Sequence, residues 1–292
     1  MSHQSTSTHT LIDENPRQPV DRRSNLSQVE FEKTYLFPNR PVIFSDGLLF
    51  WKAVRKWTPE YFKSRFFERK ITIDNVNFTV AEFIDLLRHS SHENPAPYLR
   101  AQKIAEVFPE LLPEIQPPFP YSQSNWGHSK AFPGWIQRFV MPEILIGGKG
   151  GRFHALHYDN CHLHAYVAQV YGRKHFYLLP PDQTPFIYPN PEIPNTSLIK
   201  NIHQPDEDRF PLFRKAKFIS ETLEPGEVVF VPNGWWHTTL MPEISISITW
   251  NQVNASNWTE FSTDIQAVYA EKHPALSTLF RLYGNVARLF LK

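Results

Sequence analysis

One stretch of the chain holds most of the residue types that could bind a metal ion. It runs from Arg152 to Pro181 and contains a His-x-Asp pair, His157 and Asp159, followed by two apolar segments. On a β-strand, side chains two residues apart point to the same face, so this pair could approach one metal ion together. The pair alone is weak evidence, because the chain has 13 histidines.

His237 is the best candidate for a third ligand. It follows the apolar run Glu227–Pro232, which is typical of a buried strand, and the turn Asn233-Gly234, which would bring the chain back toward the sheet. The alternative is a core histidine with an ordinary hydrogen bond. Two imidazoles and one carboxylate with open coordination positions are the ligands that non-haem Fe(II) oxygenases use.

Lys174 gives the second chemical indication. It shares one face of an expected strand with Phe176 and Leu178, and a lysine on an apolar face needs a paired anion. The alternative is a lysine at the end of a strand whose amine reaches water. If Lys174 faces inward, the distal carboxylate of a dicarboxylate cosubstrate is a natural counter-ion, and Tyr98 could supply a hydroxyl to the same group.

The elements that must position these residues are mainly β. Apolar and alternating patterns predict many strands without intervening helices, which favours a closed or sandwiched β core. The strict alternation of Ile244–Trp250 is the clearest strand pattern. The predicted core strands are Phe139–Ile146, Ala165–Tyr171, His175–Leu179, Phe218–Leu223, Glu227–Val231 and Ile244–Trp250.

Helical signals lie on both sides of this β region. Thr58-Pro59-Glu60 and Thr79 with Glu82 have the residues of helix N-termini. Apolar residues recur at helical spacing in 258–269 and 274–291. We therefore predict a disordered arm over 1–26, a helical and mixed lead-in over 27–135 packed on the core, the core over 136–253, and C-terminal helices over 254–292.

Composition limits the classes of function. The 292 residues are 41% hydrophobic with a formal charge of +1, so nucleic acid is not indicated as a partner. The single cysteine, Cys161, excludes an internal disulfide and is expected to pack rather than react. No apolar run reaches membrane-spanning length, and the N-terminus lacks the apolar segment of a signal peptide. We expect an intracellular, cytoplasmic protein, in which the Asn-x-Ser/Thr matches, Asn195 among them, are chance.

Four motifs together resemble a known family. HALHYD, AQVYGRKHFYLLPPDQ, LEPGEVVFVPNGWWHTT and ISITWNQVNASNW are similar to the JmjC/cupin-like Fe(II)- and 2-oxoglutarate-dependent hydroxylases, most of all to the factor-inhibiting-HIF type of asparaginyl hydroxylase. The resemblance extends from Phe31 to Trp258. It implies a double-stranded β-helix core of the jelly-roll, cupin-like kind, with a helical lead-in and C-terminal helices.

The resemblance also implies roles for individual residues. His157, Asp159 and His237 would bind Fe(II), with 2-oxoglutarate and O2 as cosubstrates. Lys174 and Tyr98 would bind the distal carboxylate of 2-oxoglutarate, and Asn251 would lie beside its metal-chelating end. The C-terminal helix over 274–291 would form a homodimer.

Some positions depart from the family pattern. His154 stands where a threonine hydroxyl usually helps Lys174, and its imidazole could either replace that hydrogen bond or narrow the pocket. The segment Asn160–Ala165 is longer than in the closest members, and Ala165 and Val253 replace an asparagine and a tryptophan of those members. These differences leave the predicted metal site intact but affect the prediction of the substrate.

Three functions are consistent with the sequence. We favour hydroxylation of a side chain of a peptide or protein. The same chemistry could act on RNA, a small metabolite or methyl-lysine, although no motif for a methylammonium pocket with an acidic or aromatic lining is visible. The third possibility is a non-catalytic metal-binding cupin that acts as a scaffold or sensor.

Overall fold

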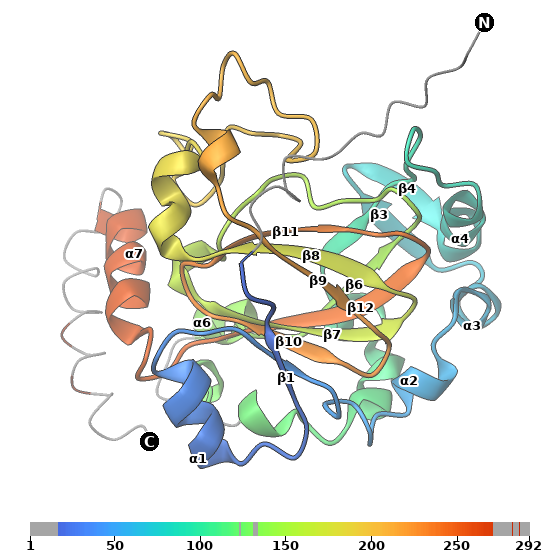
Figure 1. Cartoon of the computed structure of the whole chain (residues 1–292). Helices are drawn as coiled ribbons and strands as arrows, with labels where there is room; N and C mark the ends of the chain where they lie inside the picture. Colours follow the sequence, from blue (N-terminus) through green and yellow to red (C-terminus); the bar gives the residue numbers. More distant parts are fainter. Residues whose placement is uncertain (1–16, 123, 131–133, 271–281, 283–285, 287–292) are drawn as a thin grey trace, which may run out of the picture.

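Two β-sheets form the centre of the protein (Figure 1). The computed structural model describes residues 17–122, 124–130 and 134–270, together with the single positions Leu282 and Val286. The larger sheet has seven strands in the order β1 (Asp21–Arg23), β2 (Val42–Phe44), β10 (Val228–Val231), β7 (His164–Tyr171), β12 (Ser245–Gln252), β6 (Glu143–Gly147) and β5 (Leu99–Lys103). The smaller sheet has the order β11 (Trp236–Leu240), β8 (Lys174–Leu179) and β9 (Ile219–Leu223).

The two sheets share a core, because strands from both contribute to one cluster of buried side chains. Leu145 and Val167 of the larger sheet belong to this cluster, as do Phe176 and Leu178 of the smaller sheet. Except for the β1–β2 pair, the strands of both sheets pair antiparallel. The predicted mainly β fold with a double-stranded β-helix core is confirmed.

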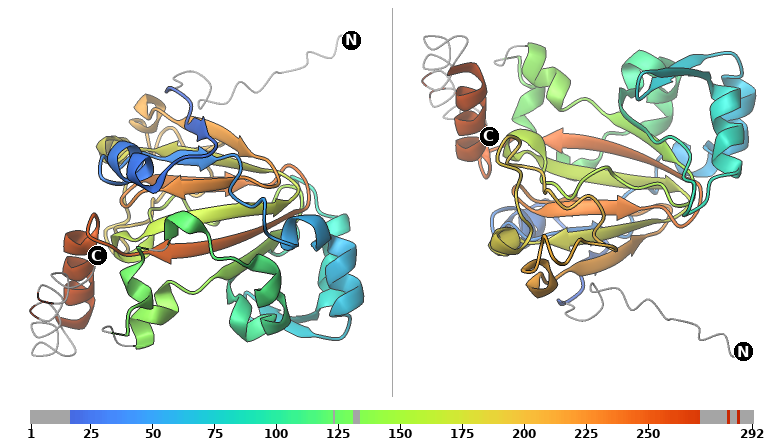
Figure 2. Two further views of the ribbon diagram at one scale, coloured as in Figure 1. Left: turned by 90° about the horizontal axis from the view of Figure 1, so that it is seen from below. Right: turned by 90° about the horizontal axis from the view of Figure 1, so that it is seen from above.

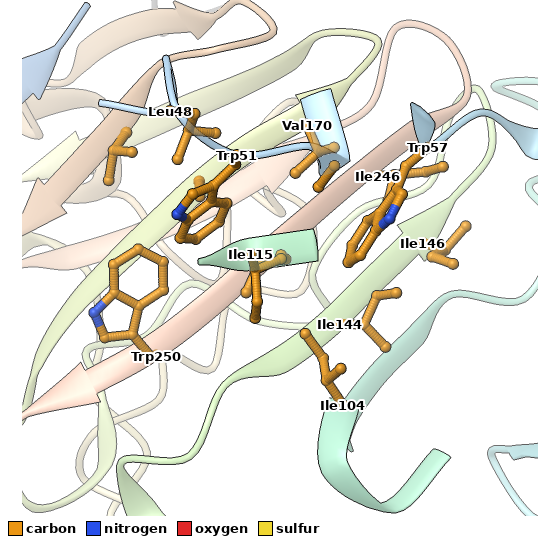
Figure 3. Packing of buried hydrophobic residues seen from close by; sticks show 14 of the residues in the cluster. Leu48, Trp51, Trp57, Ile104, Ile115, Ile144, Ile146, Val170, Ile246 and Trp250 are labelled. Carbon is orange, nitrogen blue, oxygen red and sulfur yellow. The ribbon is translucent and has the colours of Figure 1, made fainter. Parts of the chain in front are cut away.

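The outer face of the larger sheet is covered by the lead-in segment. On β12, Ile246 and Trp250 point to this face and pack in one cluster with Trp51 and Trp57 (Figure 3), and Ile248 belongs to the same cluster. The alternate residues of β12 are polar and lie on the inter-sheet face, as expected from the period of two along a strand. The alternation read in the sequence therefore separates a hydrophobic outer core from a polar wall between the sheets.

Helices lie at both ends of the sheets (Figures 1 and 2). The helices α3 (Pro59–Arg65) and α4 (Val80–Arg88) lie with the hairpin of β3 (Lys70–Ile73) and β4 (Val76–Thr79) at one end, and α7 (Trp258–Ala270) lies at the other. The remaining helical segments are α1 (Gln28–Phe31), the π-helical η1 (Glu32–Leu36), α2 (Ala53–Lys56), α5 (Ile104–Val107), α6 (Gly134–Phe139), and the 3-10 segments η2 (Pro109–Ile115), η3 (Pro120–Ser122), η4 (Trp126–His128), η5 (Asn160–His162), η6 (Pro181–Phe186) and η7 (Phe213–Lys215).

Both predicted helix N-termini are confirmed. The hydroxyl of Thr58 accepts a hydrogen bond from the backbone of Tyr61, with Pro59 in the first turn of α3. Thr79 and Glu82 form a complete capping box at the start of α4. Each cap satisfies backbone N–H groups that a helix leaves without an internal partner, which fixes where these helices begin.

The prediction of a disordered arm is wrong for residues 17–26. Residues Asp21–Arg23 form β1, which pairs in parallel with β2. Arg22 binds Glu221 and Glu227 of the β9–β10 region at 2.7 and 3.1 Å. Backbone pairing with β2 and ionic contacts, rather than apolar burial, hold this polar strand, which is why the low hydrophobicity of the arm did not indicate it. Residues 1–16 lie outside the described part of the chain.

The role of the lead-in also differs from the prediction, and the C-terminal prediction is described in part. The lead-in does not only pack on the core, because it supplies β2 and β5 to the larger sheet itself. The predicted helix over 258–269 is present as α7. The second C-terminal helix, over 274–291, lies outside the described residues apart from Leu282 and Val286, and the homodimer stays a prediction.

No helix within the described residues combines the length and the apolar character needed to cross a bilayer.

Phe31 tests the packing of the lead-in on the sheet. It is fully buried, and its ring lies 5.5, 5.3 and 5.2 Å from the rings of Phe44, Tyr121 and Phe230. Phe31→Ala should lower the free energy of unfolding by about 3–5 kcal/mol through the cavity that it leaves. Urea denaturation measures this loss. The control Phe37→Ala, at a position that is 60% exposed, should change it by less than about 0.5 kcal/mol. Similar losses in both variants would contradict this packing.

Candidate active site

The structure brings the three predicted metal ligands together. One donor atom from each of His157, Asp159 and His237 lies within 4.8 Å of the other two. His237 Nε2 and Asp159 Oδ2 are 3.8 Å apart. This is the only group of three or more His, Cys, Asp or Glu side chains with such spacing in the part of the chain that the structure describes.

The local structure around these residues differs from the prediction. The turn at Asn233-Gly234 leads into a strand that the sequence did not reveal, β11, and His237 is its second residue. His157 and Asp159 do not lie on a named strand. They lie in an extended segment in which His157 forms isolated bridges with His237 on one side and Thr196 on the other.

Reciprocal backbone hydrogen bonds align the two histidines. His157 N donates to His237 O at 3.0 Å, and His237 N donates to His157 O at 2.6 Å. Residues directly opposite each other in an antiparallel pair have side chains on the same face. The two imidazole rings consequently lie 4.3 Å apart between their centroids.

The hydrogen bonds of the imidazoles select the tautomer that can bind a metal ion through Nε2. His157 Nδ1 lies 3.2 Å from Ala155 O, and His237 Nδ1 lies 3.0 Å from Trp235 O. A carbonyl oxygen only accepts, so each Nδ1 must carry a hydrogen, and in the neutral tautomer each Nε2 then has a free lone pair. A ligating histidine commonly has such a backbone partner for its other nitrogen. The donor set therefore fits a divalent metal ion.

Burial acts on the charges of the same residues. It raises the pKa of Asp159, while His237 and a hydrogen bond from Asn251 oppose the rise. Burial and the neighbouring His237 lower the pKa of His157 well below its usual value. A neutral imidazole is the form that binds metal, and a cation would stabilise the carboxylate form of Asp159.

These residues line a cavity of about 590 Å³ between the two sheets. Its wall also contains apolar side chains from both sheets, namely Leu145, Val167 and Phe176, together with Phe153. Polar side chains of β6 and β12 form another part, and arginines from β5 and α6 belong to the lining as well. These charged and polar residues are Glu143, Thr249, Asn251, Arg100 and Arg138.

Lys174 points into this cavity and not to water. Its side chain is 1% exposed, and Nζ donates to Tyr98 Oη at 3.4 Å. Burial lowers the pKa of Lys174 to about 7 and raises the pKa of Tyr98. No acid among the described residues forms an ion pair with Lys174. A buried amine with only a hydroxyl partner is costly, which makes this end of the cavity suited to an anion.

Asn251 and His154 also line the cavity. Asn251 Nδ2 donates to His164 O at 3.4 Å, and the Asn251 side chain hydrogen-bonds Asp159. The ring of His154 lies 4.6 Å from that of Phe153, and burial lowers its pKa. Among the described contacts, none joins His154 to Lys174. The structure therefore places His154 on the wall rather than as a hydrogen-bond partner of the lysine.

Sequence reasoning missed an ion pair in the cavity wall. Lys103, Glu143 and Thr249 are neighbours across β5, β6 and β12. Lys103 Nζ lies 2.6 Å from Glu143 Oε1, and the Lys103 residue is 9% exposed. The charge of Glu143 contributes to the raised pKa of Asp159. Only the strand register brings these residues together, so no local pattern could have identified them.

Comparison with known proteins identifies the family. The model of the cupin-like domain matches residues 28–256. The chain belongs to this family. It is 28% identical over 269 residues to the arginine-specific demethylase JMJ20 of Arabidopsis thaliana, and this alignment covers 80% of this chain and 56% of that protein. It is 26% identical over 234 residues to lysine-specific demethylase 8 of Xenopus tropicalis, and this alignment covers 75% of this chain and 49% of that protein.

A shorter region is more similar to another relative. It is 42% identical over 113 residues to the human HSPB1-associated protein 1, which covers 36% of this chain and 22% of that protein. The chain thus spans about half or less of the length of most of the relatives named here. The predicted JmjC/cupin-like family is confirmed, whereas the closer likeness to the factor-inhibiting-HIF type stays a prediction.

Lys174 should make stability depend on pH. Its pKa of about 7 in the folded protein lies below the value of about 10.4 for an unfolded lysine. Between these values the unfolded chain holds a proton that the folded protein lacks, so the free energy of unfolding rises with pH by up to about 1.4 kcal/mol per unit. Below the folded pKa of about 7, Lys174 is protonated in both the folded and the unfolded protein, so the full free-energy cost of burying its charge remains.

Lys174→Met should remove this contribution. The difference in unfolding free energy between the wild-type protein and this variant, measured by urea denaturation across that pH range, should therefore favour the wild type increasingly as pH rises. Parallel pH profiles for the two proteins would show that Lys174 is not a buried, unpaired amine.

Proposed function

We propose that the protein is an Fe(II)- and 2-oxoglutarate-dependent oxygenase that hydroxylates a side chain of a peptide or protein. One observation carries this proposal. The His157, Asp159 and His237 donor set and the buried amine of Lys174 line the same cavity of about 590 Å³. A metal-binding scaffold or sensor requires the first feature but gives no reason for the second.

The two histidines and Asp159 would hold the iron. Three protein ligands leave coordination positions for a chelating cosubstrate and for O2. The bound metal would supply the activation of O2 that is coupled to decarboxylation of 2-oxoglutarate to succinate. The chain orients this ligand set through the backbone carbonyls that fix both imidazoles and through Asn251, which hydrogen-bonds Asp159.

Lys174 and Tyr98 would bind the far end of the cosubstrate. A dicarboxylate has one carboxylate to place near the metal and a second that can reach a cation deeper in the cavity. Pairing with this second carboxylate would offset the cost of burying Lys174, and the Tyr98 hydroxyl could donate to the same oxygen atoms. Phe176, from the same strand as Lys174, and Leu145 would keep water from this end.

A peptide or protein substrate is supported by the relatives and by the shape of the site. Two relatives are named as arginine- and lysine-specific demethylases. These names describe enzymes that act on amino-acid side chains, which fits a peptide or protein substrate. In this chain the cavity extends to Arg138, whose side chain is 62% exposed, and to the edge strand β5. An opening beside an edge strand could accommodate an extended segment of a polypeptide.

The lining of the cavity favours a second candidate, the oxidation of an N-methyl group on a basic side chain. The sequence showed no acidic or aromatic lining for such a group, but the cavity contains the aromatic residues Phe139 and Phe153 together with Glu143, whose carboxylate is paired with Lys103. A carboxylate and aromatic faces are the groups that attract methylated cations. The two candidates differ in their products, because demethylation releases formaldehyde and hydroxylation adds one oxygen atom to the peptide.

The first test is the release of succinate from 2-oxoglutarate. With Fe(II), O2 and a library of peptides, the wild-type protein should form succinate, and Asp159→Ala should reduce the rate at least about 100-fold, because removal of a ligand destroys the site. Mass spectrometry of the peptides and an assay for formaldehyde separate the two candidates. Metal binding without succinate from any peptide would favour the scaffold.

The second test concerns Lys174. Loss of a buried hydrogen bond to a charged group costs about 1.5–3 kcal/mol, so Lys174→Ala should raise the concentration of 2-oxoglutarate needed for half-maximal turnover roughly 10- to 150-fold. Its affinity for Fe(II) should stay unchanged. Lys215→Ala, at an exposed lysine outside the cavity, serves as the control. An unchanged requirement in Lys174→Ala would remove this lysine from the cosubstrate site.

A further inference from the structure

The segment that carries Asp159 has an unfavourable backbone conformation. Directly after Asp159 the chain makes the 3-10 turn η5, in which Cys161 and His162 have φ values of 56° and 49°. This left-handed region is disfavoured for residues other than glycine, and such residues persist there only when the surrounding structure holds them. The position of a metal ligand next to this turn therefore depends on contacts from elsewhere.

Asn195 makes such contacts with both neighbours of Asp159. Its side-chain amide donates to Tyr158 O at 2.9 Å and to Asn160 Oδ1 at 2.7 Å. Its backbone carbonyl accepts a hydrogen bond from Tyr158 N at 3.1 Å. One residue from the connection between β8 and β9 thus binds the chain on either side of the carboxylate ligand.

The same connection also supports His157. Thr196 forms a bridge with His157, and Ser197 N donates to Leu156 O at 2.8 Å. The segment Asn195–Ser197 consequently lies along one side of the ligand-bearing segment, while β11 with His237 lies along the other. Asn195 is the residue of this segment whose side chain reaches past Asp159.

Helix α7 holds the far end of the turn. Asp264 Oδ2 lies 2.7 Å from His162 Nδ1, and Asn257 Nδ2 donates to His162 O at 3.0 Å. These contacts fix His162 in its left-handed conformation. The residues from Tyr158 to His162 are therefore held at one end by Asn195 and at the other by residues in and just before α7.

We propose that Asn195 is a positioning residue for the metal ligand Asp159, supported by the His162–Asp264 pair. The inference rests on the metal centre of the proposed function. Asn251 hydrogen-bonds the Asp159 carboxylate, but the position of that carboxylate also depends on where the backbone of Asp159 is held. Residues that orient a ligand from outside the coordination sphere typically change metal affinity about 10- to 100-fold when they are mutated.

Binding of Co(II) tests this role without any turnover. The wild-type protein, Asn195→Leu and the control Asn201→Ala would be titrated with Co(II) by calorimetry and visible absorption. Leucine has nearly the shape of asparagine but no donor, and the backbone bond to Tyr158 remains. Asn201 lies in the same connection, and among the described residues its side chain hydrogen-bonds Gln204 and the backbone of His203.

We expect the dissociation constant of Asn195→Leu to rise roughly 10- to 100-fold, with altered Co(II) absorption bands. Asn201→Ala should match the wild type. Asn160→Ala removes one of the two amide contacts at an exposed position and should give a smaller loss. The double variant Asn195→Leu/Asn160→Ala should bind no more weakly than Asn195→Leu alone, because their shared contact is already lost. Circular dichroism establishes that each variant is folded.

The inference would be overturned if folded Asn195→Leu and Asn160→Ala kept the Co(II) affinity and absorption bands of the wild type. It would also be overturned if Asn201→Ala lost as much Co(II) affinity as Asn195→Leu. Either result would leave the proposed function standing, since the wild-type protein would still bind the metal. Failure of the wild-type protein to bind Co(II) or Fe(II) would overturn the proposed function and this inference together.

Discussion

The pairing of His157 with His237 is the contact on which the rest of the site depends. Two reciprocal backbone hydrogen bonds join an extended segment to the edge of the smaller sheet and place both imidazoles on one face. The shared core between the sheets and the connection that carries Asn195 hold the two partners of this pair. Because the bonds are made by the backbone, the spacing of the histidines is fixed by strand register and not by flexible side chains.

Buried charge is the second constraint, and it works against stability. Lys174 is buried with a hydroxyl as its partner, and Asp159 is held where burial opposes its ionisation. In the same cavity Lys103 and Glu143 compensate each other. A buried charge without an ionic partner is costly, and buried groups with strongly shifted pKa values in clefts cluster at functional sites. Lys103 has an acid as its partner, whereas Lys174 has none among the described residues. This difference indicates that the end of the cavity at Lys174 is suited to an anion.

The sequence predicted the parts of the site that depend on residue type and short spacing. His157 and Asp159 share a two-residue spacing, and Lys174 stands out on an apolar strand. Strand β11 was missed because Trp236–Leu240 has no polar and apolar alternation, being buried at nearly every position. Strand β1 was missed because it is polar and held by ion pairs with distant glutamates. Glu143 and Asn195 reach the site through long-range register and loop contacts, which local patterns do not contain.

The proposed metal and cosubstrate sites are tested most directly by a crystal structure of the protein grown without oxygen in the presence of Mn(II) and 2-oxoglutarate. We expect an anomalous scattering peak from a metal ion bound to His157 Nε2, His237 Nε2 and the Asp159 carboxylate. One carboxylate of 2-oxoglutarate should lie within hydrogen-bond distance of Lys174 Nζ and Tyr98 Oη. A metal ion bound elsewhere, or a cosubstrate that leaves Lys174 without an anion, would contradict the proposed site.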